Sequence, residues 1–278
     1  VVNVYQQVVF AAMFGVDRGF GVAVMPAVVR YGFYERFLPI FTLLFGIGFA
    51  IFLDSADRRT DRARLVLTRR LVALGVLGAL HQVVHQGEVL LPYAVFGLVF
   101  LLPASFLGPR VALIVGLLLL AVGGQTIAGY GVMPGLLVIG LALARLGVHR
   151  TLGSHLRRWL VATAFFGLVT VAYLTAIVAG IPIPTLSLGP TALSSQLAAV
   201  AAGMLYTCLV VLLLRTPLRG VLTRVLAPMG RMALTNYLLA TALILTLAPV
   251  LGISHTDDGP MIALLVVGII VIEAVWSR

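Results

Sequence analysis

Nine apolar runs follow one another along the chain, and most are close to the length that crosses a membrane as a helix. Such a crossing needs about 17–25 predominantly apolar residues. Of the 278 residues, 61% are hydrophobic and only 10% are charged, whereas a soluble domain carries about a quarter charged residues. Lipid must therefore cover much of the surface. The sequence predicts an all-α fold, a polytopic transmembrane helix bundle of about 8–10 spans. The runs lie at 37–53, 71–84, 89–106, 111–127, 134–144, 159–179, 197–214, 229–251 and 261–276.

All 19 basic residues are arginine, and arginine occurs in every second connector between the runs. Cytoplasmic connectors of membrane proteins carry an excess of basic residues, so this alternation predicts the orientation as well as the span count. It also accounts for the net charge of +10, so we expect the lipid bilayer as a partner and no nucleic acid. The connectors with arginine are 54–70, 108–110, 145–158 and 215–231, and those without it are 85–88, 123–133, 181–196 and 253–258.

Three ionisable residues, His81, His85 and Glu88, interrupt an apolar stretch near the predicted outer face. Ionisable groups at membrane depth are costly and mark functional sites. Their i, i+4, i+7 spacing places them on one face if the helix is unbroken, although Gly87 is a residue type that can end the helix first. Three interpretations stay open: acid–base chemistry by an imidazole with a carboxylate, a metal site, or a hydrogen-bonded polar cluster of structural value.

Four further polar residues stand at the ends of apolar runs. Arg36 precedes the run at 37–53, where it is either a functional residue or an anchor at the membrane interface. Tyr93 follows Pro92 and could donate a hydrogen bond into a site or lie in the interfacial aromatic belt. Arg231 and Asn236 occur in GRMALTNYLLA, where an asparagine between helices often serves packing.

Three stretches together resemble the YeiB-like family of bacterial membrane proteins, whose function is largely undefined. They are RFLPIFTLLFGIGFAIFL, RRLVALGVLGALHQVVHQGEVLLPYAVFGL and MGRMALTNYLLATAL, which begin at Arg36, Arg69 and Met229. The resemblance implies a multi-pass protein of the bacterial inner (plasma) membrane. It also implies a relationship to membrane acyltransferases, including heparan-α-glucosaminide N-acetyltransferases and O-antigen type acyltransferases. In that group a cytoplasmic acyl-CoA supplies an acyl group to an extracytoplasmic sugar hydroxyl or amine.

The resemblance also assigns roles to residues. His81 matches the family's histidine, as a general base or transient acyl acceptor, and Glu88 stands where the family usually has aspartate, as the group that orients the histidine. Arg36, Tyr93, Arg231 and Asn236 fall on motif positions and are expected to bind substrate. His85 has no counterpart, so no metal is predicted. We expect no bound cofactor, with acyl-CoA as the donor substrate and an extracytoplasmic glycan as a partner.

Two alternatives to an acyltransferase-like enzyme remain. The polar cluster suits a transporter or permease-like protein for a small polar solute or lipid, and it also suits a structural role in membrane assembly. We expect residues 1–278 to form a single transmembrane domain that is a fragment. Val1–Val2–Asn3 resembles the end of the family's first span, so that span and the C-terminal basic tail are expected to be missing.

Overall fold

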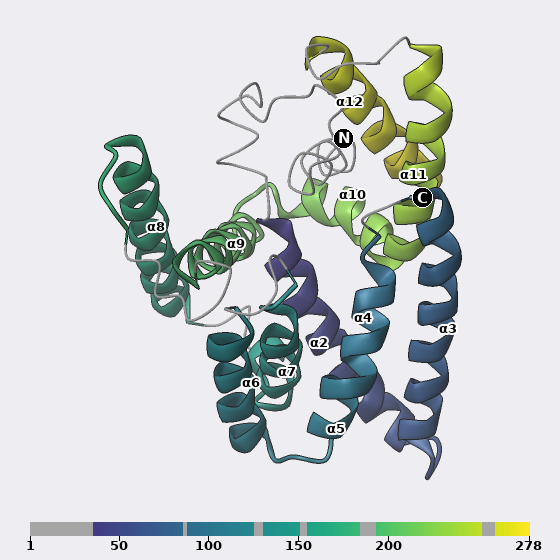
Figure 1. Cartoon of the computed structure of the whole chain (residues 1–278), viewed down its shortest axis with the longest axis vertical. Helices are drawn as coiled ribbons and strands as arrows, with labels where there is room; N and C mark the ends of the chain where they lie inside the picture. Colours follow the sequence, from purple (N-terminus) through teal and green to yellow (C-terminus); the bar gives the residue numbers. More distant parts are fainter. Residues whose placement is uncertain (1–35, 86–87, 125–129, 151–154, 184–192, 252–258) are drawn as a thin grey trace. The chain divides into compact units, whose positions relative to one another are not determined.

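Helices account for every regular element in the part of the chain that the structure describes, as the all-α prediction requires (Figure 1). The structure is a computed structural model that describes residues 36–85, 88–124, 130–150, 155–183, 193–251 and 259–278. Residues 1–3, which we expect to end an earlier span, lie outside these ranges. The chain divides into a large unit, residues 35–83 and 88–212, and a small unit, residues 1–34, 84–87 and 213–278. The expected single transmembrane domain stays a prediction.

Four helices in the described ranges are long and apolar enough to cross a membrane by length and composition. They are α2 (Phe37–Asp57), α8 (Leu156–Val178), α9 (Leu193–Leu213) and α11 (Ala233–Val250). Shorter apolar helices occupy other predicted runs. These are the stretch Leu90–Ala104, α6 (Pro109–Gly123), α7 (Met133–Arg145) and residues Leu264–Trp276 of α12 (Gly259–Trp276). The lengths and compositions fit a membrane helix bundle.

The remaining elements are short or carry charge. The stretch Leu90–Ala104 consists of α4 (Leu90–Phe96), a π-helical turn η3 (Gly97–Leu101) and α5 (Leu102–Ala104). Between α2 and α4 runs α3 (Ala63–Val84), and η4 (Val148–Arg150) is a single 3-10 turn after α7. In the small unit, α10 (Arg219–Arg231) precedes α11.

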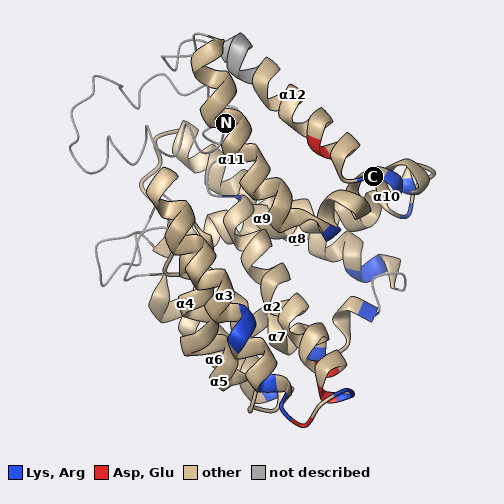
Figure 2. Cartoon of the chain, turned by 90° about the vertical axis from the view of Figure 1, so that its right-hand side faces the viewer, with Lys and Arg blue, Asp and Glu red and all other residues tan. Residues whose placement is uncertain are grey.

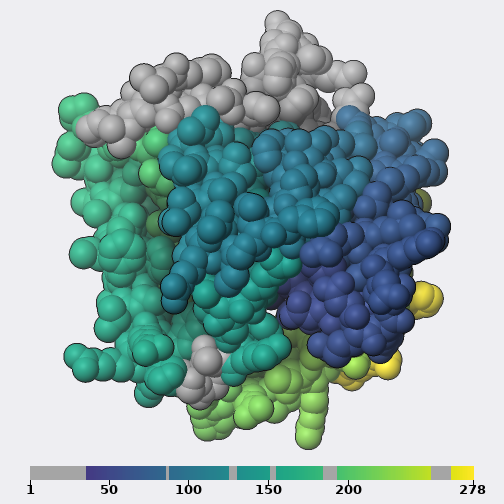
Figure 3. Space-filling view, turned by 90° about the horizontal axis from the view of Figure 1, so that it is seen from below, coloured from purple at the N-terminus to yellow at the C-terminus, as the bar shows by residue number. Residues whose placement is uncertain are grey.

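Helix α7 forms the centre of the large unit. Almost every residue from Met133 to Ala144 is buried, as expected for a helix that is apolar on all sides and enclosed by neighbours. Its 13 residues extend only about 20 Å at 1.5 Å per residue, which is less than the hydrocarbon thickness. Helices α2 and α6 pack along it. In Figure 3 the blue atoms of α2 and α3 lie beside the teal atoms of the helices that follow.

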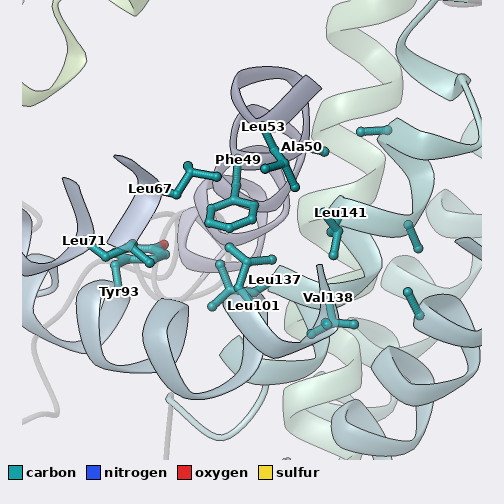
Figure 4. Packing of buried hydrophobic residues seen from close by; sticks show 14 of the residues in the cluster. Phe49, Ala50, Leu53, Leu67, Leu71, Tyr93, Leu101, Leu137, Val138 and Leu141 are labelled. Carbon is teal, nitrogen blue, oxygen red and sulfur yellow. The ribbon is translucent and has the colours of Figure 1, made fainter. Parts of the chain in front are cut away.

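The core lies where α2, α3 and the α4–α5 stretch meet α7. Figure 4 shows the Phe49 ring of α2 beside Leu137 of α7 and Leu101 of η3. Burial of each such side chain contributes roughly 1.5–3 kcal/mol to the free energy of folding relative to full exposure. Leu53 and Leu141 are fully buried in the same cluster. This core holds α3, which bears His81, and α4, which bears Tyr93 and begins two residues after Glu88, in fixed positions.

Two predicted boundaries differ from the structure. Helices extend into the arginine-bearing connector 54–70 from both sides, because α2 continues to Asp57 and α3 begins at Ala63. The predicted span 229–251 is also divided, because Met232 departs from helical geometry with φ −103° and ψ 21°. Arg231 consequently ends α10 and does not lie inside the following span.

The two ends of the large unit differ in charge, as the alternation of connectors predicts. At one end, Arg64 of α3 and Arg145 of α7 both donate hydrogen bonds to the Ser105 carbonyl, at 3.3 and 2.8 Å. Three arginine-bearing connectors therefore meet there, and Figure 2 shows acidic and basic segments together where α2 passes into α3. At the other end, the start of α4 lies beside the end of α3.

Candidate functional site

A buried histidine and a buried glutamate face one another at the end of the large unit opposite Arg64 and Arg145. The Nδ1 atom of His81, in the last turn of α3, lies 3.9 Å from Oε1 of Glu88. The His81 side chain is 7% exposed and that of Glu88 is 0% exposed. The separation is within ion-pair range and slightly too long for a direct hydrogen bond. A small movement of either side chain would join them.

Glu88 is held by the start of α4. One carboxylate oxygen accepts a hydrogen bond from the Leu90 backbone N–H, and the other accepts one from Leu91 N–H at 2.9 Å. These N–H groups have no partner within their own helix because they lie in its first turn. The positive end of the helix dipole also favours a carboxylate here. The carboxylate that faces His81 is therefore fixed by the backbone of the next helix.

The chain reverses direction between the two residues. Helix α3 ends at Val84, so the alternative in which an unbroken helix places His81, His85 and Glu88 on one face is wrong. Gly78, one turn before His81, lets the start of α4 approach α3: a β-carbon there would lie 2.5 Å from the Leu91 nitrogen. This close approach of backbones brings Glu88 back to the histidine.

Tyr130 is a residue that the sequence analysis did not select. It is half-buried in the turn that precedes α7, outside the membrane-spanning helices. Burial raises the pKa of its phenol above the ordinary value, and the negative charge of Glu88 raises this pKa further. Tyr130 is therefore close enough to feel the Glu88 charge. Tyr130 is the one residue with an ionisable side chain in the glycine-rich connector 123–133. That is the signal by which it could have been found.

Arg36 and Tyr93 have separate environments within the large unit. Arg36 stands at the start of α2 and is 8% exposed, and its Nε atom has no hydrogen-bond partner among the described residues. The Tyr93 hydroxyl lies 2.9 Å from the Thr42 hydroxyl, which itself donates to the Leu38 carbonyl at 2.7 Å. The Tyr93 ring stacks on Phe45 with centroids 5.2 Å apart. Tyr93 thus joins α4 to α2 inside the core.

The other candidates belong to the small unit. Arg231 is exposed at the end of α10. Asn236 is buried, and its amide nitrogen donates to the Ser277 hydroxyl at 3.0 Å and to the Met229 carbonyl at 3.3 Å. This asparagine therefore joins α11 to the end of the chain and to α10. His85 is 3% exposed and follows the end of α3.

The geometry permits proton transfer at a buried imidazole. A carboxylate beside one ring nitrogen orients the imidazole and stabilises the imidazolium, and the second ring nitrogen is the atom that exchanges a proton with a reacting group. In the described ranges, no three histidine, cysteine, aspartate or glutamate side chains are grouped so that they could hold a metal ion.

Comparison with known proteins shows that part of the chain is similar to a family of unknown function. The family described as "Protein of unknown function (DUF418)" matches residues 143–278. That is about half of the chain. The match includes Arg231 and Asn236 and leaves out His81, Glu88, Arg36 and Tyr93. The YeiB-like resemblance is consistent with this family.

Two relatives from Bacillus species also match. The "Uncharacterized 39.9 kDa protein in amylase 3'region" of Bacillus acidopullulyticus is 31% identical over 236 residues, which cover 77% of this chain and 66% of that protein. The "Uncharacterized protein YxaH" of Bacillus subtilis (strain 168) is 29% identical over 76 residues, 27% of this chain and 19% of that protein. The chain thus spans just under two thirds of the first relative and about one fifth of the second. No solved structure matches.

Proposed function

We propose that this membrane protein transfers an acyl group from a cytoplasmic acyl-CoA to an extracytoplasmic sugar or other acceptor, with His81 as the general base. The observation that carries the proposal is the buried pair of His81 and Glu88, 3.9 Å apart, at the end of the large unit opposite Arg64 and Arg145. A membrane protein gains little stability from isolated ionisable groups at such a place, so a chemical role explains their presence.

The reaction requires one proton to move twice. Nε2 of His81 takes the proton from the acceptor hydroxyl or amine. At the same time the acceptor oxygen or nitrogen attacks the thioester carbonyl, and the C–S bond then breaks. The imidazolium returns the proton to the departing thiolate, so the products are an ester or amide and free CoA. Glu88 stabilises the imidazolium through Nδ1, and the backbone N–H groups of Leu90 and Leu91 keep it in place.

Arginines supply the expected contacts with the anionic donor. Arg231 is exposed in an arginine-bearing connector, and acyl-CoA carries phosphates that arginine binds as a bidentate donor. Arg36 is buried with an unused Nε donor among the described residues, which suits a carbonyl or hydroxyl of a substrate. Tyr93 and Asn236 each join helices by their hydrogen bonds, and contact of their side chains with substrate stays a prediction.

The test uses the full-length protein in sealed vesicles with radiolabelled acetyl-CoA on the cytoplasmic side and a panel of sugar acceptors outside. Label should reach an acceptor with wild-type protein. His81→Ala should reduce the rate at least about a hundredfold, as expected for loss of a general base, and Glu88→Gln should reduce it less. His149→Ala, which removes a half-buried imidazole elsewhere, is the matched control and should retain activity.

Other outcomes distinguish the alternatives. Label that stays on the protein and depends on His81 assigns the histidine as a transient acyl acceptor, with the same overall reaction. Solute flux that depends on Glu88 without transfer of label assigns a transporter and overturns the proposal. Full transfer by His81→Ala removes the histidine from the mechanism.

A further inference from the structure

Helix α8 is the least enclosed long helix of the large unit. None of its residues from Leu156 to Val178 is buried. It contacts α9 at two points. A β-carbon on Gly167 would lie 3.7 Å from the Leu205 side chain, and the Thr163 side chain forms a hydrogen bond with Cys208. Its other side carries large exposed apolar side chains, including Phe165, which is 59% exposed. In a membrane protein such a face contacts lipid.

Two adjacent arginines begin this helix. Arg157 and Arg158 are both exposed, and among the described residues neither forms an ion pair with a carboxylate. They are the last two residues of the arginine-bearing connector 145–158, so they lie at the cytoplasmic boundary by the charge alternation. Two unpaired guanidinium groups at this level attract the phosphates of anionic lipids.

The two arginines lie at one end of an open pocket whose other lining residues are apolar. An open pocket of about 610 Å³ is lined by Arg157 and Arg158 and, further along the helix, by Val161, Ala162, Phe165 and Phe166. Arg158, Val161 and Phe165 are spaced i, i+3, i+7 and therefore share one helix face. At 1.5 Å per residue, Phe165 lies about 10 Å below Arg158 along the helix. The headgroup layer is about 5–8 Å thick, so Phe165 lies at the level of the acyl chains.

We propose that this face binds one anionic phospholipid of the cytoplasmic leaflet, its phosphate on Arg157 and Arg158 and an acyl chain against Phe165. A free phosphate would use the arginines alone and leave the aromatic pocket without a role. An acidic protein would meet a surface that turns apolar within one helical turn. A phospholipid has charge and hydrocarbon at the separation that the face presents. The site is independent of the proposed acyl transfer.

The test measures lipid binding by native mass spectrometry of the full chain in detergent micelles, with added phosphatidylglycerol or phosphatidylcholine. The wild type should retain phosphatidylglycerol in preference to phosphatidylcholine. The double variant Arg157→Ala/Arg158→Ala should bind phosphatidylglycerol roughly twenty-five-fold more weakly, about a factor of five for each arginine near a membrane surface. Phe165→Ser should weaken the binding of both lipids and preserve the preference for phosphatidylglycerol over phosphatidylcholine.

The matched control is Arg58→Ala/Arg59→Ala, which removes two adjacent exposed arginines at a helix end without an aromatic pocket in the described structure. It should bind phosphatidylglycerol as the wild type does. Equal losses in the two double variants would mean that net charge alone governs binding, and that result overturns the site. Wild-type affinity in the Arg157/Arg158 variant, or full displacement of the lipid by inorganic phosphate, overturns it as well.

Discussion

Gly46 of α2 and Gly140 of α7 meet backbone to backbone, and a β-carbon on either would lie 3.1 Å from the Cα atom of the other. The added carbon on Gly46 would also collide with the Leu137 carbonyl, and that on Gly140 with the Leu43 carbonyl. Small residues permit such close crossings of membrane helices, because packing drives their association in lipid. The crossing fixes the long helix α2 to the central helix of the large unit.

Replacement of either glycine should destabilise the protein. In Gly46→Ala the new methyl group meets backbone atoms, which cannot move aside as a side chain can, so we expect a loss of about 1–3 kcal/mol, the usual cost of overpacking. Gly46→Leu should prevent folding. Gly48→Ala is the control, since nothing lies within 4 Å of the added carbon. Thermal unfolding in detergent measures the effect, and equal midpoints for the Gly46 and Gly48 variants would contradict the crossing.

Removal of the Glu88 carboxylate should destabilise the start of α4. In Glu88→Ala the Leu90 and Leu91 N–H groups lose their acceptor, and loss of such a cap costs about 0.5–2 kcal/mol. Glu88→Gln keeps one acceptor oxygen and should recover part of that stability. Asp61→Ala, which removes an exposed carboxylate, should have little effect. Amide hydrogen exchange of residues in α4 reports the change directly, and unchanged protection in Glu88→Ala would argue against the capping role.

Arg145 should be hard to replace. Its two terminal nitrogens donate to the Leu107 and Ser105 carbonyls, both at 2.8 Å, and they join α7 to the turn before α6. Hydrogen bonds to charged groups contribute about 1.5–3 kcal/mol, so Arg145→Ala should lower the unfolding free energy by an amount in that range. Arg145→Lys should be nearly as harmful because an ammonium lacks the planar pair of donors. Arg150→Ala, at an exposed position, serves as the control.

The helical architecture follows from the apolar runs, but helix ends were harder to predict. The run 134–144 matches α7 closely because its residues are apolar on every side. The break at Met232 within the run 229–251 could not be predicted from the sequence. The stretch MGRMALTNYL contains neither a helix-breaking proline nor a capping residue at that point. Hydropathy averages over a window and cannot detect a single residue that leaves helical geometry.

The site could be predicted in part. His81 and Glu88 were selected because ionisable residues stand out in an apolar sequence, and the structure brings them together. The way in which they meet was not predictable, because it depends on the approach of α4 to Gly78, a contact between separate helices. Tyr130 was missed for the same reason: its relation to Glu88 exists only in the folded chain. The roles of Arg36, Tyr93, Arg231 and Asn236 in substrate binding stay predictions.

Tyr130 should make the protein sensitive to alkaline pH. Burial, followed by the Glu88 charge, raises the pKa of its phenol in the folded state. In the unfolded chain this phenol ionises near the ordinary pKa of about 10. Below that pH both states hold the proton, and the phenol has no effect on the pH dependence of the unfolding free energy. Above it the unfolded state loses the proton first. Stability therefore falls as the pH rises from the unfolded pKa through the folded one.

Tyr130→Phe should remove this loss, so its unfolding midpoint should decline less than that of the wild type between neutral and strongly alkaline pH. Glu88→Gln should remove only the smaller cause and shift the Tyr130 pKa part of the way back. Tyrosinate absorbance during a pH titration identifies the late-ionising group, which should be absent in Tyr130→Phe and present in Tyr173→Phe, a change on the lipid-facing helix α8. If both variants lose the same fraction of the late signal, Tyr130 is not the group whose pKa is raised by burial and by the Glu88 charge.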